Sequence, residues 1–234
     1  MNVAVIGRGN VGSQFARIFG VQPIPPRSLR GLPLDADLYI IAVSDAAVVE
    51  VANKLPKLNG IVVHTTGSVP IEALNAVECK GYGVFYPFQT INRQRPLPAS
   101  TIPLLIEASD DRTRDFILSV ANDYGFGKIQ FADSDRRRKV HLAGAFACNF
   151  TNAMIAVSQK ILDECDIEPE IINPLIFETF EKLKTNRAKD VQTGPAIRKD
   201  LPTLKKHIDL LKNLDMAEEC AIYTDISNYI INNS

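Results

Sequence analysis

The sequence predicts an α/β protein in which a Rossmann-type, doubly wound parallel sheet is followed by an all-helical C-terminal domain. Over the first 133 residues, short β-rich runs alternate with segments of helical periodicity, which is typical of parallel strands covered by helices. A Gly-x-Gly-x-x-Gly loop follows the first of these runs. From residue 134 onward only helical periodicity is present, so we expect a first domain at 1–133 and a helical domain at 134–234.

The expected strands are mostly apolar throughout, as strands buried on both faces of a sheet should be, and they span 2–7, 38–44, 60–65, 81–86, 102–107 and 127–132. Helical spacing lies between them at 10–20, 45–55, 70–77 and 111–125, and Asp45 and Asp110 are the expected N-caps. The segment 21–37 is rich in proline and glycine, which predicts an abbreviated second strand and crossover. The helical domain should contain helices at 134–164, 168–188, 200–213 and 215–232.

Composition narrows the functional classes. The chain has 26 Lys plus Arg against 27 Asp plus Glu, so its near-zero net charge disfavours nucleic-acid or anionic-membrane partners. Four scattered cysteines without metal-ligand spacing predict reduced thiols and no metal site. The uncharged stretch 140–159 is long enough to span a bilayer, but its histidine and asparagines make that costly, and Met1 leads directly into an apolar strand rather than a signal peptide. We therefore expect a soluble, cytoplasmic protein.

The glycine loop predicts a dinucleotide site. Gly7 would permit the tight turn, Gly9 would let a pyrophosphate approach the backbone, and Gly12 would allow close packing of helix and strand. The intervening Arg8, Asn10 and Val11 would present backbone N–H groups at the helix N-terminus. The alternative is a purely structural strand–turn–helix.

The segment that contains Arg27 and Ser28 favours NADP over NAD as the cofactor. The segment where a ribose-binding acid would normally lie offers Arg27 and Ser28 and no carboxylate, and arginine suits a 2′-phosphate. Alternatively, these are solvated loop residues.

Further candidates lie where other strands end, since ligands of open α/β sheets bind at the carboxyl edge. Val43, Ser44 and Asp45 end one strand, and Asp45 is an N-cap, a cofactor contact or both. His64 and Thr65 end the next, where His64 is either a cofactor contact and proton donor or a structural histidine. Pro87 and Gln89 follow a third strand and would face the substrate.

A polar stripe runs along the first helix of the helical domain. On an ideal helix, Cys148 and Asn152 lie within about 20° of His141, and Asn149 lies at about 80°. Small residues separate these polar groups where a solvated face would carry lysine and glutamate. The stripe is therefore either a polar network between helices or one wall of a cleft for cofactor and substrate. Farther along, Arg198 either clamps a substrate anion or pairs with Asp200.

These motifs together resemble a known family. The motifs are "GRGNVG", "AVSD", "HTTGS", "YPFQT", "HLAGAFACNF" and "TGPAIRKDLPTLKKHIDLL". In this order they resemble the 6-phosphogluconate-dehydrogenase-like superfamily, and within it the Rossmann-like oxidoreductases whose C-terminal part is domain of unknown function 2520. That resemblance implies an NADP-binding domain, a helical domain that forms a homodimer, and hydride transfer to a small substrate. Where this family tends to have histidine before the proline, the chain has Tyr86.

We therefore predict an NADP-dependent oxidoreductase that transfers hydride between the nicotinamide and a small carbonyl or imine substrate. His141, Asn149 and Gln89 would orient the substrate, Pro87, Asn152 and Arg198 would contact it, and His64 or His141 would donate the proton. The alternatives are a non-catalytic NADP-binding sensor or assembly module on the same fold, and a methyltransferase with a comparable glycine loop.

Overall fold

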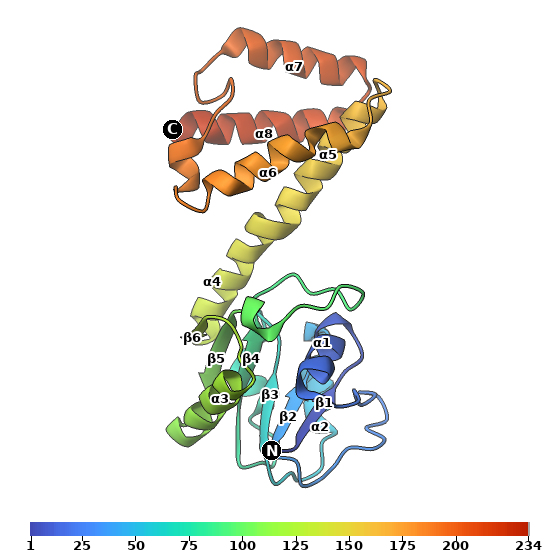
Figure 1. Ribbon diagram of the computed structural model, residues 1–234, viewed down its shortest axis with the longest axis vertical. Coiled ribbons are helices and arrows are strands. Elements are labelled where there is room, and N and C mark those ends of the chain that lie inside the picture. Colours follow the sequence, from blue (N-terminus) through green and yellow to red (C-terminus); the bar gives the residue numbers. More distant parts are fainter. Residues whose placement is uncertain (234) are drawn as a thin grey trace. The chain divides into compact units, whose positions relative to one another are not determined.

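The structure is a computed structural model that describes residues 1–233, and it divides into two compact units (Figure 1). The first unit is Met1–Asn149 and the second begins at Phe150. The composition changes at residue 133, where we expected the domain boundary, but the division between the units lies within the helical segment that follows. The first turns of that segment belong with the sheet because Arg137 is anchored there, as described below.

Every expected strand and every long expected helix is present, with ends that differ from the expected ones by a few residues. The first unit contains β1 (Val3–Ile6), α1 (Asn10–Phe19), β2 (Leu38–Ile41), η1 (Asp45–Ala47), α2 (Val48–Asn53), β3 (Ile61–His64), η2 (Ile71–Leu74), β4 (Gly81–Pro87), η3 (Ala99–Thr101), β5 (Leu104–Ala108), α3 (Asp111–Asp123), β6 (Ile129–Phe131) and α4 (Ser134–Gly144). A π-helical segment, η4 (Ala145–Phe150), leads out of it. The second unit contains α5 (Thr151–Asp163), η5 (Pro169–Ile172), α6 (Asn173–Lys182), η6 (Ala188–Val191), α7 (Leu201–Asn213) and α8 (Ala217–Asn233).

The six strands form one sheet in the order β1-β2-β3-β4-β5-β6. Most neighbours are parallel, as predicted, but β4 and β5 are antiparallel, with Phe85 opposite Ile106. The connection between these two strands contains only the short η3 and no long helix. A parallel pair needs a crossover of a dozen or more residues, usually helical, whereas an antiparallel pair can be joined by a loop.

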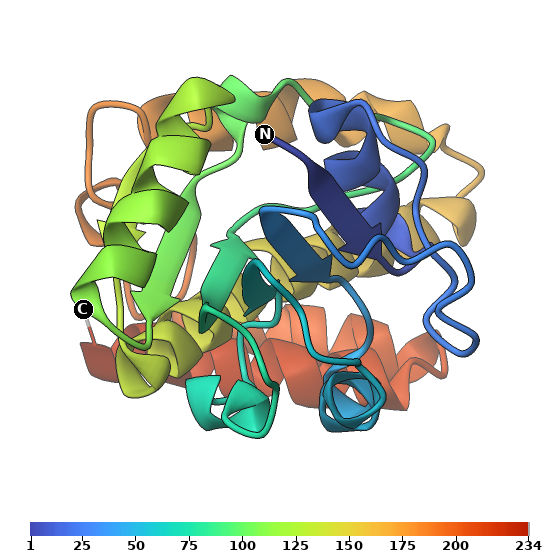
Figure 2. The ribbon, with the colours of Figure 1, turned by 90° about the horizontal axis from the view of Figure 1, so that it is seen from below.

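Apolar side chains alternate between the two faces of the sheet and form a separate core on each. Val5, Leu38 and Val63 point into the core covered by α1 and α3, whereas Ile6, Tyr39 and Val62 point into the core covered by α2 and η2. Figure 2 shows α1 and α3 on one side of the strands and α2 on the other. Burial on both faces explains why these strands are continuously apolar.

The abbreviated second strand of the repeat is confirmed. It consists of a single parallel bridge between Ile24 and Ile6, held by hydrogen bonds from Ile24 N to Val5 O (2.8 Å) and from Gly7 N to Ile24 O (2.9 Å). β1 therefore lies between this bridge and β2. The segment that follows β1 in the chain pairs on one side of it, and β2 pairs on the other. Such a switch point is where open α/β sheets bind their ligands.

The helical segment from Ser134 to Asp163 is long and apolar enough to cross a membrane by length and composition. It consists of α4, η4 and α5, and its π-helical hydrogen bonds run from residue i to i+5. Because a π turn takes more residues than an α turn, residues after Ala145 do not keep the angular positions of an ideal helix. The predicted stripe therefore does not continue unchanged from His141 to Asn152.

Candidate active site

The glycine loop after β1 is shaped by backbone contacts. Gly7 has a φ of +130°, and a Cβ atom there would lie 2.0 Å from the carbonyl oxygen of Ala42. A Cβ at Gly12 would lie 2.2 Å from the carbonyl oxygen of Gly7, whereas a Cβ at Gly9 would meet nothing within 4 Å. Gly7 is thus suited to the turn and Gly12 to close packing, in line with the roles expected for them, and Gly9 leaves open space at the N-terminus of α1. That space is suited to an anion.

A cavity of about 630 Å³ lies over this loop. Most of the predicted cofactor residues line it, namely Gly7, Arg8, Gly9, Asn10, Val11, Arg27, Val43, Ser44, Asp45 and Thr65. Three others do not: Gly12 packs on Gly7, the Ser28 hydroxyl accepts a hydrogen bond from Arg30 N at 3.4 Å, and His64 is buried, as described below. The residues that the sequence pattern predicts for a cofactor site therefore mostly line one cavity.

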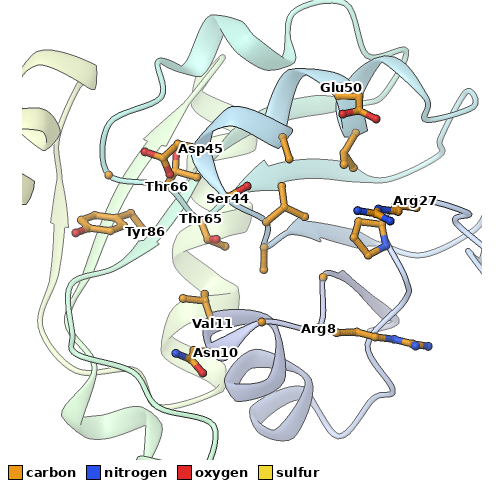
Figure 3. A pocket seen from close by; sticks show the side chains of 18 of the residues that line it. Arg8, Asn10, Val11, Arg27, Ser44, Asp45, Glu50, Thr65, Thr66 and Tyr86 are labelled. Carbon is orange, nitrogen blue, oxygen red and sulfur yellow. The ribbon is translucent and has the colours of Figure 1, made fainter.

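The two ends of this cavity differ in chemistry. Figure 3 shows Arg8 and Arg27 at one end and Asp45, Thr66 and Tyr86 at the other. The carboxylate of Glu50 also lines the arginine end. The sequence-based prediction covers only residues at strand ends and in loops, and it misses Glu50 because that residue lies on α2. Its Oε1 accepts a hydrogen bond from Lys54 at 2.6 Å, which lowers the pKa of Glu50.

The two predicted N-caps have different outcomes. Asp110 caps α3, with Oδ1 accepting from Thr113 N at 2.8 Å. Asp45 is not a cap, because it lies inside η1 and its carboxylate accepts a hydrogen bond from the Ser68 hydroxyl instead. Asp45 is therefore held toward the next strand-to-helix turn, at the edge of the cavity.

His64 is not at the cavity, contrary to one of the two roles considered for it. Its side chain is fully buried at the end of β3, and Nδ1 accepts a hydrogen bond from Thr66 N at 3.3 Å. Burial, reinforced by the positive charge of Arg137, lowers the pKa of His64 to about 4. The imidazole is neutral near pH 7 and does not line the cavity, so the geometry supports the structural role.

Tyr86 and His141 meet between two cavities. The Tyr86 hydroxyl lies 2.9 Å from Nδ1 of His141, and both residues line the first cavity and a second one of about 430 Å³. Burial, together with the negative charge of Asp45, raises the pKa of Tyr86 to about 12. A Cβ atom at Gly67 would lie 2.5 Å from Nδ1 of His141, so Gly67 makes room for the imidazole.

Among the described residues, no Asp, Glu, Lys or Arg lines the second cavity, whose lining is Tyr86, Phe88, Gln89, Thr90, His141, Gly144, Ala145, Ala147, Cys148 and Asn149. Three of the predicted catalytic residues, His141, Asn149 and Gln89, therefore share one cavity. The Gln89 side chain hydrogen-bonds the backbone of its own loop: Nε2 donates to Thr101 O at 2.9 Å, and Oε1 accepts from Thr90 N at 2.8 Å.

Comparison with known proteins agrees with this architecture. Residues 102–230 match the family described as a domain of unknown function (DUF2520). A solved structure from Bacteroides fragilis, described as a candidate NADP oxidoreductase, is 30% identical, with a TM-score of 0.87 over 98% of this chain and 97% of that one. The chain belongs to the DUF2520 family.

More distant structures share the fold of this DUF2520 protein. A protein from Thermotoga maritima is 20% identical, with a TM-score of 0.71 over 97% of this chain and 88% of that one. Pyrroline carboxylate reductase from Plasmodium falciparum, with NADP bound, is 12% identical, with a TM-score of 0.58 over 99% of this chain and 98% of that one. No curated protein matches the sequence.

Three predicted substrate residues of the DUF2520 protein do not line either cavity. Pro87 is buried at the end of β4, and Asn152 and Arg198 belong to the second unit. Arg198 forms no ion pair with Asp200 among the described residues, and the Asp200 carboxylate caps α7 and accepts from Thr203 N at 3.2 Å. Arg198 is exposed.

A buried ionic cluster anchors α4 of the DUF2520 protein to the sheet. Arg137 has no exposed surface, and its guanidinium donates to the Glu107 carboxylate on β5 and to the carbonyl of Val69. The Ser134 hydroxyl also donates to Glu107, at 2.9 Å. Arg137 belongs to the run Arg136–Lys139, and no local signal in the sequence distinguishes it from its neighbours. Its anchor lies one helical turn before His141.

Proposed function

We propose that this protein is an NADP-dependent oxidoreductase that transfers hydride between the nicotinamide and a small carbonyl or imine substrate. The observation that carries the proposal is that the cavity over the glycine loop and the smaller uncharged cavity share Tyr86 and His141. A dinucleotide site and a substrate site that meet at two groups able to exchange protons suit this reaction class.

The residues of the larger cavity fit a dinucleotide. Open space above Gly9 leaves room for a pyrophosphate at the N-terminus of α1. Arg8 and Arg27 at one end suit the adenosine 2′-phosphate, and the one carboxylate lining that end, Glu50, is hydrogen-bonded to Lys54. These features favour NADP over NAD. The opposite end, at Tyr86, is then left for the nicotinamide.

The smaller cavity would hold the substrate. A bound reduced nicotinamide supplies hydride, and the protein supplies position and a proton. His141 and Asn149 would orient the carbonyl or imine, while Gln89 shapes the loop beside it. A lining without formal charge favours a substrate that is neutral at its reacting end.

Relatives support the reaction class. The Bacteroides fragilis structure, described as a candidate NADP oxidoreductase, covers nearly the whole chain at 30% identity. We also propose that the family lies within the 6-phosphogluconate-dehydrogenase-like superfamily, as the order of motifs suggests, and that the protein acts in the cytoplasm.

We further propose a homodimer formed through the helical unit. Among the described residues, α5 and α6 bury no side chain, and Leu175 and Phe177 on α6 are 70% and 65% exposed. Apolar side chains so exposed favour a protein partner, and a second copy presents the same surface. Sedimentation equilibrium should give the dimer mass, and Leu175→Asp should give the monomer; a wild-type monomer would refute this part.

Calorimetric titration with NADPH, NADH and S-adenosylmethionine tests the proposed function. We expect NADPH to bind more tightly than NADH, and Arg27→Ala to weaken only the NADPH affinity, by roughly tenfold, as expected for loss of one charge-assisted contact. Binding of none of the three would sink the proposal, and binding of S-adenosylmethionine alone would point to a methyltransferase. NADPH binding without NADPH oxidation over a panel of small ketones, oxo acids and cyclic imines would favour the non-catalytic module.

A further inference from the structure

The contact between Tyr86 and His141 has the features of a proton-transfer pair. The hydroxyl and Nδ1 are 2.9 Å apart, and the two rings meet edge to face with centroids 5.9 Å apart. Tyr86 is half-buried at the end of β4, whereas His141 is open to solvent. The pair therefore connects the junction of the two cavities with water.

Few other groups at the junction can give up a proton. Among the described residues, the titratable ones that line both cavities are Tyr86 and His141. Asp45 is a hydrogen-bond acceptor from Ser68, and Glu50 lies at the arginine end with Lys54. His64, the other donor considered from the sequence, is buried away from both cavities.

We propose that the Tyr86 hydroxyl donates the proton to the substrate and that His141 restores it from solvent. This inference rests on the proposed oxidoreductase function and names its acid. It differs from the sequence-based expectation, in which a histidine donates directly.

The proton and electron balance is complete. Hydride from the reduced nicotinamide dinucleotide forms a new C–H bond at the carbonyl or imine carbon, and the electron pair of the C=O or C=N π bond moves to the heteroatom. The Tyr86 O–H bond breaks and its proton neutralises that heteroatom. The phenolate oxygen then takes the Nδ1 proton of His141, and the His141 ring takes up a proton from solvent in its place.

The surroundings keep Tyr86 protonated until it is used. Asp45 disfavours the phenolate by its negative charge, the Arg137 guanidinium opposes that effect, and His141 is the direct hydrogen-bond partner. Burial prevails, and the pKa of Tyr86 is raised to about 12. The phenol therefore remains an acid over the whole range in which the protein would work.

The test compares Tyr86→Phe with a matched control, Tyr82→Phe, which removes a hydroxyl from the same strand without lining either cavity. NADPH affinity is measured by calorimetry, tyrosinate formation by ultraviolet absorbance against pH, and turnover with whichever ketone or cyclic imine the wild-type protein reduces fastest. We expect Tyr86→Phe to bind NADPH within about twofold of wild type and to lose roughly 100-fold or more in kcat, the usual contribution of a general acid. Tyr82→Phe should retain both.

A substitution that shifts the acidity without changing shape provides a second readout. Replacing Tyr86 by 3-fluorotyrosine makes the phenol more acidic, so the alkaline limb of the kcat profile should move to lower pH, which a purely structural tyrosine would not cause. Equal kcat in Tyr86→Phe and wild type, or ionisation of Tyr86 together with the ordinary tyrosines, would overturn the inference while leaving the proposed function intact. A wild-type protein that binds NADPH and reduces no compound would overturn both, and calorimetry separates that case from loss of the cofactor site.

Discussion

Arg137 and Glu107 form a buried ion pair that joins the start of α4 to β5. The guanidinium is fully buried and the Glu107 side chain is 16% exposed. Such a pair adds little to the free energy of unfolding when it is intact, but removing one partner leaves an uncompensated charge in the interior. The cluster therefore matters less as a source of stability than as the fixed point from which α4 carries His141 to Tyr86.

Arg137→Met should lower the free energy of unfolding by roughly 3 kcal/mol, because the Glu107 carboxylate loses its counterion. Urea unfolding at neutral pH measures this loss. The exposed neighbour Arg136 is the matched control, and Arg136→Met should change the free energy of unfolding by less than about 0.5 kcal/mol. The double variant Arg137→Met with Glu107→Leu should recover part of the loss. Similar effects of the two single substitutions would contradict the anchoring role.

Gly67→Ala should displace the His141 imidazole, since the added Cβ would lie 2.5 Å from Nδ1 and 2.6 Å from Cγ. Overpacking of this kind costs roughly 1–3 kcal/mol of unfolding free energy. In a His141→Ala background the two shortest contacts disappear and only the contact with the Cβ of residue 141, at 2.9 Å, remains, so the same Gly67→Ala substitution should cost about 1 kcal/mol less. Denaturation of the four proteins in this cycle gives the coupling, and a coupling near zero would mean that Gly67 does not shape the histidine site.

Sequence reasoning succeeds here where the signal is local. The six strands follow from continuous apolar runs, and the cavity over Gly7 and Gly9 follows from the glycine spacing at the end of a strand. It fails where a contact joins distant positions. Tyr86 and His141 are 55 residues apart in the chain, and nothing local indicates that they meet.

Two further features escape sequence reasoning for specific causes. Arg137 sits in a run of arginines and lysine that reads as a solvated surface, yet its side chain is enclosed by β5 and the Val69 carbonyl, which only the tertiary structure brings there. The predicted angle between His141 and Asn152 assumes an ideal α-helix, but the π-helical η4 lies between these residues and changes that angle. Hydrogen-bond pattern within a helix is not encoded in hydrophobic periodicity.

His64 should make stability depend on pH below neutrality. Its pKa in the folded protein is about 4, below the ordinary value of 6.5, so the unfolded chain binds the proton more readily. The stability associated with neutral His64 is therefore complete above about pH 6.5 and is lost as pH falls toward 4, by roughly 3 kcal/mol in total. Unfolding free energies at several pH values, compared between wild type and His64→Gln, test this. The glutamine variant should show a flatter profile, and parallel profiles would refute the assignment.

Gly9→Ala separates the two roles of the glycine loop. A Cβ at Gly9 meets nothing within 4 Å, and the residue has a φ of −74°, which alanine adopts readily. The variant should therefore fold with nearly wild-type stability, while its methyl group occupies the space expected for the pyrophosphate and weakens NADPH binding by tenfold or more, about 1.4 kcal/mol. Gly7→Ala is the contrasting variant, because its Cβ would lie 2.0 Å from the Ala42 carbonyl oxygen and should destabilise the fold itself. Calorimetry with NADPH and thermal unfolding of both variants distinguish the roles, and undiminished NADPH affinity in Gly9→Ala would place the dinucleotide elsewhere.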